Sequence, residues 1–121
     1  MPNEMVGGQQ TGGNNPQKAG NLRRPEAFTR VVRFLAQESS QVIITTHAEE
    51  RMYERGITTK MLFDTLRKGV LVGNVEEAKK AGDYQGKIAA QMPNRRHVGV
   101  VTVVKQGEKL IIVTVEWEDG R

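Results

Sequence analysis

Helical periodicity opens the patterned part of the chain. Behind Pro25, apolar residues recur at spacings of three and four: Phe28, Val31, Val32 and Leu35. This spacing puts the four side chains on one face of a helix. Proline suits the first turn, where its missing N–H has no helical partner to lose. We therefore predict a helix over residues 25–38. Basic residues occupy its other side and the approach to it: Arg23, Arg24, Arg30 and Arg33.

A second helix follows a β-branched run at residues 41–46 (QVIITT), which is long enough for a strand. Thr46 and Glu49 form a T-x-x-E capping box, which predicts a helix that starts at His47. Gly56 suits the end of this helix because glycine adopts the left-handed conformation freely.

A third helix is predicted between Thr58 and Gly69. Thr58 suits the N-cap position and Gly69 the end. The positions between them include apolar residues at helical spacing: Met61, Leu62, Phe63 and Leu66. Together with the second helix, this segment forms a helix–turn–helix hairpin.

The last third of the chain changes to the two-residue period of strands. Residues 84–92 alternate between two faces, 97–104 (HVGVVTVV) are nearly continuous apolar, and 109–117 (KLIIVTVEW) alternate again. The connector KQGEK (residues 105–109) is typical of a tight hairpin turn. Residues 70–73 (VLVG) form a further candidate strand. The order of elements predicts an α+β fold with helices packed on one face of a small antiparallel sheet.

One face of this sheet is expected to stay open. The helices should cover the more apolar side of the last strand, which we assign to Ile111, Val113, Val115 and Trp117. The other face then presents polar residues: Lys87, Gln91, Thr114 and Glu116.

The position of His97 depends on the hairpin turn. If Gln106 and Gly107 form a two-residue turn, His97 lies opposite Glu116 and next to Thr114. A three-residue turn shifts the register by one and removes His97 from that face. We favour the first register.

The length of 121 residues allows one small domain. Residues 1–22 are rich in Gly, Asn and Gln and lack an apolar period. Such a segment cannot offset the entropy lost on ordering, so we predict a disordered tail. Residues 23–121 then form a single α+β domain.

Composition narrows the environment and the partners. The chain has no cysteine, and we find neither a secretory signal nor an apolar run of transmembrane length. We expect a cytoplasmic protein with no membrane partner. The formal net charge of +4 falls on the predicted domain, because Glu4 and Lys18 cancel in the tail. This balance favours an anionic partner such as RNA.

We expect no metal site and no cofactor. The two histidines lie on separate predicted elements, and the acidic residues match none of the usual ligand spacings. The Gly-Gly pairs lie in the predicted tail, so no glycine loop is available to cradle a phosphate.

His47, Arg51 and Arg55 lie four residues apart, on one stripe of the second predicted helix. Histidine suits proton transfer because its unperturbed pKa is ~6.5, and an arginine fork donates two parallel hydrogen bonds to a phosphate. In a second interpretation, His47 caps the helix and the arginines pair with Glu50 and Glu54 on a solvated surface. Such exposed pairs contribute ~0.3–0.5 kcal/mol each. Both interpretations remain open.

The stretch HAEERMYERGI (residues 47–57) resembles the H-x-x-E-R-M-x-E-R-G-I signature of a bacterial and phage family, domain of unknown function 4258. A strand around Tyr84, a V-x-V-rich strand and a final I-I-V-T-V strand holding Thr114 are also similar. The resemblance covers about residues 41–117. It implies the RelE/ParE-like fold of small bacterial ribonucleases and toxins, which is an analogy between folds.

The resemblance also implies a catalytic set. His47 would transfer protons at a helix start, where free N–H groups and the dipole favour an anion. Arg51 and Arg55 would hold the phosphate, and Thr114 would bind a phosphate oxygen or orient the nucleophile. A strand threonine also needs no functional reason, so the structural interpretation of Thr114 stays open.

Five further residues are candidates for substrate binding: Tyr84, Lys87, Arg95, Arg96 and His97. The cations among them could contact flanking phosphates. Simpler roles also fit, because Arg95-Arg96-His97 suits a basic turn and Tyr84 suits packing at the core or edge.

Two functions from different classes fit these patterns. Our leading hypothesis is a toxin-type ribonuclease that cleaves RNA without a metal, with a cognate antitoxin or immunity protein as its partner. The alternative is a non-catalytic module of phage or mobile-element origin that binds nucleic acid or a host protein. A third hypothesis is a remnant of a toxin fold that serves only as a partner-binding scaffold.

Overall fold

The computed structural model describes residues 21–120 of the chain. The predicted tail therefore lies outside the described residues, except for its last two. Leu22 is only 4% exposed and packs in the hydrophobic core. The packed domain thus includes Leu22, one residue before the predicted domain start.

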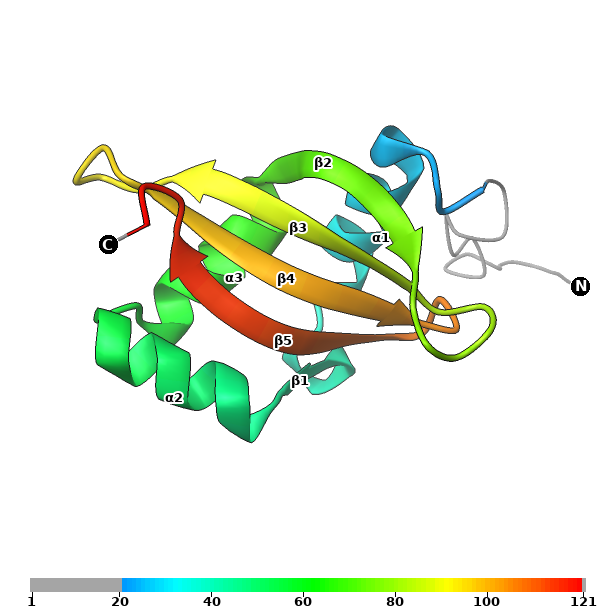
Figure 1. The fold of residues 1–121 in the computed structure, drawn as a ribbon, viewed down its shortest axis with the longest axis horizontal. Helices are drawn as coiled ribbons and strands as arrows, with labels where there is room; N and C mark the ends of the chain where they lie inside the picture. The colour runs from blue at the N-terminus through cyan, green and yellow to red at the C-terminus, as the bar shows by residue number, and fades with distance from the viewer. Residues whose placement is uncertain (1–20, 121) are drawn as a thin grey trace, which may run out of the picture.

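Within these residues, three α-helices and five strands form an α+β fold (Figure 1). The helices are α1 (Pro25–Leu35), α2 (Thr46–Arg55) and α3 (Thr59–Lys68). A short 3-10 helix, η3 (Ser39–Gln41), precedes the first strand. The strands are β1 (Val42–Ile44), β2 (Val70–Glu77), β3 (Tyr84–Gln91), β4 (His97–Lys105) and β5 (Lys109–Trp117). The predicted α+β class is confirmed.

The strands form one sheet in the order β1-β5-β4-β3-β2. All neighbours pair antiparallel except β1, which pairs parallel with β5 from Val42 to Ile44. The sheet is therefore mixed, a difference from the prediction that arises because α2 and α3 separate β1 from the other strands along the chain. Strand β2 continues four residues beyond the predicted VLVG segment.

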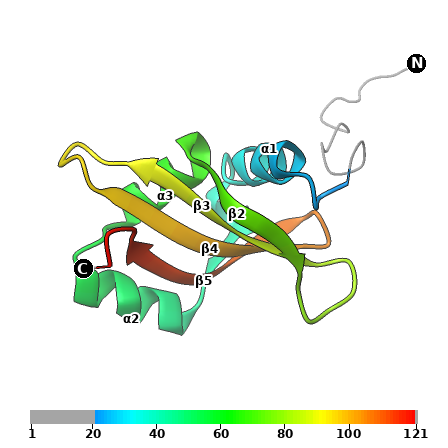
Figure 2. The same ribbon diagram turned by 45° about the horizontal axis from the view of Figure 1, so that its top comes forward.

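Helices α1 and α3 cover one face of the sheet, and α2 flanks the β5 side (Figures 1 and 2). The core lies between the sheet and the two covering helices. Fully buried side chains come from both layers: Phe28, Val31, Leu62, Leu66, Ile88, Val100, Leu110 and Val115. No described helix crosses the opposite face, which we call the open face. No helix within residues 21–120 is long and apolar enough to span a membrane.

The helix ends agree with the sequence prediction except at two places. The N-cap of α2 is Thr45 rather than Thr46, because the Thr45 side chain accepts from the Ala48 N–H at 3.1 Å. Gly56 ends α2 in the left-handed conformation at φ 67°, as predicted. Helix α1 ends at Leu35, three residues early, and Arg67 Nε binds the carbonyl of Ala36 just beyond it at 2.9 Å.

A bulge in β5 corrects the predicted faces of the last strand. Val101 pairs with Thr114, but Thr102 pairs with Ile112, so Val113 has no partner across the ladder. The buried positions therefore change parity: they are Leu110, Ile112, Val115 and Trp117. Ile111 and Val113 were predicted on the buried side and are only partly buried. An alternating sequence pattern cannot reveal such a bulge, because Leu110 to Val113 are all apolar.

The same bulge decides the position of His97. The turn has three residues, since Lys105 pairs with Lys109, and this shifts the register by one. The bulge shifts it once more, so Glu116 lies opposite Gly99 and not opposite His97 as we predicted. The Glu118 N–H donates to the His97 carbonyl at 2.8 Å. Two shifts restore the original face, and His97 lies on the open face beside Glu118.

Candidate functional site

Helix α2 is attached along the outer edge of β5. Thr45 Oγ1 donates to the Ile112 carbonyl at 2.7 Å, and Arg55 Nη1 donates to the Val115 carbonyl at 2.7 Å. Trp117 Nε1 donates in turn to the Arg55 carbonyl at 2.8 Å. Strand β1 pairs with β5 only as far as Ile112, and α2 borders the remainder. The helix thus forms one margin of the open face.

His47 lies at the second residue of α2 and is exposed. Unpaired N–H groups and the helix dipole favour an anion at this end of a helix. The side chain of Thr45 already caps the Ala48 N–H, so His47 is not needed as the N-cap. The structure therefore places the predicted proton carrier at an accessible position in the first turn of a helix.

Arg51 and Arg55 have different surroundings. Arg51 pairs with Glu54 at 3.1 Å, and its side chain is 31% exposed. Its Nε is buried and has no hydrogen-bond partner among the described residues. A buried donor without a hydrogen-bond partner is rare in folded proteins and therefore needs an explanation. Arg55 instead uses its guanidinium to bind the Val115 carbonyl, which is a structural role.

Thr114 lies on the open face, within the segment of β5 that α2 borders. It pairs with Val101, which pairs with Lys87, so the three residues form one row across β5, β4 and β3. Neighbouring strands lie about 4.8 Å apart, which puts the backbones of Thr114 and Lys87 roughly 10 Å apart.

Lys87 lies between two carboxylates on the open face. Its Nζ is 3.0 Å from Glu118 Oε1 and 3.3 Å from Glu116 Oε2. Burial lowers the pKa of Lys87, but hydrogen bonds and attraction from Glu118 and Glu116 outweigh this, so its pKa is raised overall. Gly99 lies directly below the Glu118 carboxylate. We call these four residues (Lys87, Gly99, Glu116 and Glu118) the open-face cluster.

The remaining substrate-binding candidates are dispersed. Arg95 is exposed in the β3–β4 turn with φ 70°. Arg96 makes two 2.9 Å bonds to Asp119, and its guanidinium lies 4.0 Å from the Trp117 ring centroid. Tyr84 packs against the core on the helix-covered side, away from Lys87. Of these candidates, Lys87 and His97 share the open face with Thr114.

The two histidines are far apart. His47 lies near Ile112, because Thr45, two residues before it, binds that carbonyl, whereas His97 lies beside Glu118. Glu118 is six residues after Ile112, which corresponds to roughly 20 Å along an extended chain. One phosphate group cannot contact both imidazoles.

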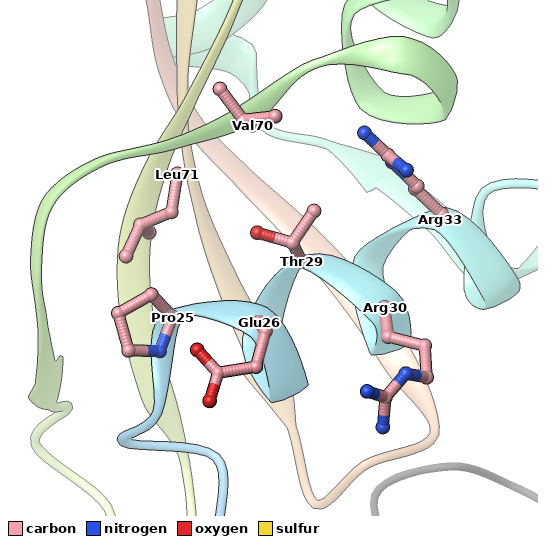
Figure 3. Close-up of a pocket in the computed structure, with 7 residues that line it drawn as sticks. All are labelled: Pro25, Glu26, Thr29, Arg30, Arg33, Val70 and Leu71. Atoms are coloured by element: carbon pink, nitrogen blue, oxygen red, sulfur yellow. The ribbon is translucent and has the colours of Figure 1, made fainter.

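A pocket of about 470 Å³ lies away from these groups, between α1 and β2 at the other edge of the sheet, and contains none of the predicted site residues (Figure 3). Arg33 lines it but donates to the Gly69 carbonyl at 2.8 Å, as a cap for α3. A smaller hollow of about 170 Å³ lies at the end of α2. Its lining consists of Arg55, Glu116, Trp117, Glu118 and Gly120.

Two members of the open-face cluster, Gly99 and Glu118, were not among the residues predicted from the sequence. The spacing E-W-E at residues 116–118 places Glu116 and Glu118 on one face of an extended segment. A glycine inside an apolar strand is a sign of close approach by another group. Together these signals could have indicated the cluster. Within residues 21–120, no three His, Asp or Glu side chains gather closely enough to hold a metal ion.

A family model matches residues 44–117, and its description is domain of unknown function DUF4258. The chain belongs to this family. The match covers α2 and strands β2 to β5, and so includes His47, Arg51, Arg55 and Thr114, whereas Glu118 directly follows it. No curated protein and no solved structure matches the chain.

Proposed function

We propose that this DUF4258 protein is a small toxin-type ribonuclease with a RelE/ParE-like fold, which cleaves RNA without a metal where α2 meets the open face. The fold relationship is an analogy that rests on the resemblance of the α2 signature. The proposal includes a cytoplasmic location, an origin in a phage or mobile element, and a cognate antitoxin or immunity protein as partner.

One arrangement supports this proposal above the others. His47 is exposed at the start of α2, and Arg51 follows one turn later on the same stripe, with a buried Nε that has no partner among the described residues. Both lie on the margin of a sheet face that presents Thr114 and Lys87. A proton-transfer group can accept the 2′-hydroxyl proton, and a guanidinium and a hydroxyl can donate to the charge that develops on the phosphate.

The chemistry proceeds in one displacement. His47 accepts the proton of the ribose 2′-hydroxyl, and O2′ attacks the adjacent phosphorus. The bond from phosphorus to O5′ breaks, which leaves a 2′,3′-cyclic phosphate and a free 5′-hydroxyl. Arg51 donates to the non-bridging oxygens in place of its contact with Glu54, and Thr114 supplies a hydroxyl donor. The leaving oxygen takes its proton from water, since His97 lies too far away.

Arg55 has a positioning role in this proposal. Its guanidinium holds α2 against the Val115 carbonyl, and α2 carries His47 and Arg51. The sequence prediction grouped Arg55 with the phosphate-binding residues. Its short hydrogen bond to the strand favours the structural role.

A specific observation favours the alternative, a non-catalytic binding module. Several predicted phosphate-binding cations already have partners within the protein: Arg55 binds Val115, Arg96 binds Asp119, and Lys87 binds two carboxylates. A protein that binds RNA without cutting it would also need no second proton-transfer group. We rank this function second, because His47 and Arg51 still fit the catalytic roles that the family resemblance implies.

The decisive experiment uses end-labelled RNA with the purified full chain in the presence of a chelator. We expect chelator-resistant cleavage with cyclic-phosphate ends, and its loss in His47→Ala. The matched control is the Tyr53→Ala variant, which should cleave RNA as wild type does, since Tyr53 is 90% exposed on the same helix. Binding of intact RNA, sensitive to salt, would support the alternative. Equal cleavage by wild type and His47→Ala would refute the role of the imidazole.

A further inference from the structure

The open-face cluster contains a space that depends on glycine. A Cβ placed on Gly99 would collide with Glu118 Oε2, and it would lie 2.9 Å from Glu118 Cδ and 3.2 Å from Lys87 Cδ. The missing side chain therefore leaves a shallow cradle on the sheet, which the Glu118 carboxylate fills. Lys87 borders the cradle and holds this carboxylate at 3.0 Å.

The carboxylate is a poor occupant of this cradle. Glu118 Oε1 pairs with Lys87, but Oε2 is buried and has no hydrogen-bond partner among the described residues. An ionised carboxylate can accept about four hydrogen bonds, and burying an oxygen that makes none is unfavourable. An anion that kept the contact with Lys87 and left its other oxygens toward solvent would be better satisfied.

We infer that the cradle over Gly99 is a binding subsite for an RNA phosphate, which Glu118 occupies as an internal substitute until RNA displaces it. The inference rests on the proposed function in one respect, namely that the anion belongs to RNA. Lys87 exchanges a carboxylate for a phosphate at the same position. The charge that enters the cradle is of the same sign as the charge that leaves, so the pairing of Lys87 is preserved.

The surroundings permit this exchange. Glu118 follows the last residue of β5, and only its backbone N–H is used in the ladder, so its side chain can rotate without loss of strand pairing. The hollow of about 170 Å³ at the end of α2, which Glu118 already lines, gives the displaced carboxylate a place. Gly99 lies two residues along β4 from the row of Thr114 and Lys87, so the subsite continues the proposed cleavage face toward a flanking phosphate.

The test measures binding of a 2′-O-methyl RNA oligonucleotide, which cannot be cleaved by this chemistry, to the full chain. Glu118→Ala removes the internal competitor, and we expect about two- to fivefold tighter binding, which corresponds to one partly exposed ion pair. Glu108→Ala is the matched control, because Glu108 is exposed in the β4–β5 turn and gives the same change in net charge. Its gain should be smaller.

Two further variants make the test specific. Lys87→Met should bind more weakly than wild type, and Lys87→Met/Glu118→Ala should show no gain over Lys87→Met. Thermal unfolding of each variant checks that the fold is kept. If Glu118→Ala binds no tighter than Glu108→Ala, or if its gain persists without Lys87, the subsite is refuted.

The subsite and the proposed function can fail separately. Tighter binding by Glu118→Ala, with no cleavage of ordinary RNA by any variant, would keep the subsite and refute the ribonuclease. Cleavage that depends on His47, without a Glu118 effect on binding, would keep the ribonuclease and refute the subsite. Absence of any RNA binding by the wild type would refute both.

Discussion

Replacement of Arg55 by Met tests whether this residue positions α2 rather than binding phosphate. The change removes the 2.7 Å hydrogen bond from Nη1 to the Val115 carbonyl but keeps the aliphatic stem. A hydrogen bond from a charged donor contributes about 1.5–3 kcal/mol. Arg55 is only partly buried, and water can reach part of this edge, so we expect a loss near the lower end, about 1.5–2 kcal/mol.

The predicted loss is large enough to measure. For a domain of about 100 residues, 1 kcal/mol lowers Tm by roughly 4–8 °C, so Arg55→Met should melt about 6–16 °C below wild type. Urea unfolding followed by tryptophan fluorescence gives the free energy directly. Trp117 Nε1 binds the Arg55 carbonyl, so the single tryptophan also reports whether the end of α2 has moved.

Arg51→Met provides the comparison on the same helix. Its ion-pair partner is the exposed Glu54, and such pairs contribute less than about 1 kcal/mol. We expect Arg55→Met to reduce stability more and Arg51→Met to reduce RNA cleavage more. If Arg55→Met were as stable as Arg51→Met, the anchoring role of Arg55 would be wrong.

Three other changes have defined outcomes. Gly69→Ala should destabilise the domain by about 2 kcal/mol or more, because the new Cβ would lie 2.6 Å from the carbonyls of Thr65 and Ala89; urea unfolding checks this. Met52→Ala should cost about 2–4 kcal/mol in the same assay, since Met52 is 7% exposed on the core side of α2, and an unchanged midpoint would contradict its core role. The pKa of Lys87 is raised in the folded protein. Its ion pairs therefore contribute fully to stability at pH values below its ordinary pKa of about 10.5, and this contribution is lost as the pH rises from there through the raised pKa. Lys87→Met should lack this part of the alkaline loss in unfolding measured against pH.

Most elements of the fold could be predicted because their signals are local. The helical spacing from Phe28 to Leu35, the cap at Thr58 and the glycine at position 56 each act within a few residues. Two-residue alternation likewise identified β3. The parallel pairing of β1 could not be found in this way, because it joins Val42–Ile44 to a strand almost 70 residues later, and no local pattern specifies such a partner.

The candidate site was less predictable, because it depends on partners. Sequence spacing put His47, Arg51 and Arg55 on one stripe, and the structure attaches Arg55 to a strand carbonyl. Lys87 was predicted on the open face, yet the pairing with Glu118 needs the register after the bulge. Residue types and spacing thus placed Lys87 and Thr114 on the open face, whereas the partner of each cation could be found only from its three-dimensional neighbours.

Val113, the residue without a counterpart across the ladder, has a consequence for mutational tolerance. Deleting it would leave the pairs on both sides of the bulge in place, because Ile112 would still lie opposite Thr102 and Thr114 opposite Val101. Thr114 and Glu116 would stay on the open face, and Val115 and Trp117 would stay in the core, now in a strand of regular alternation. The sheet should therefore tolerate a single-residue deletion at this position, at the cost of a shorter β5 beside α2.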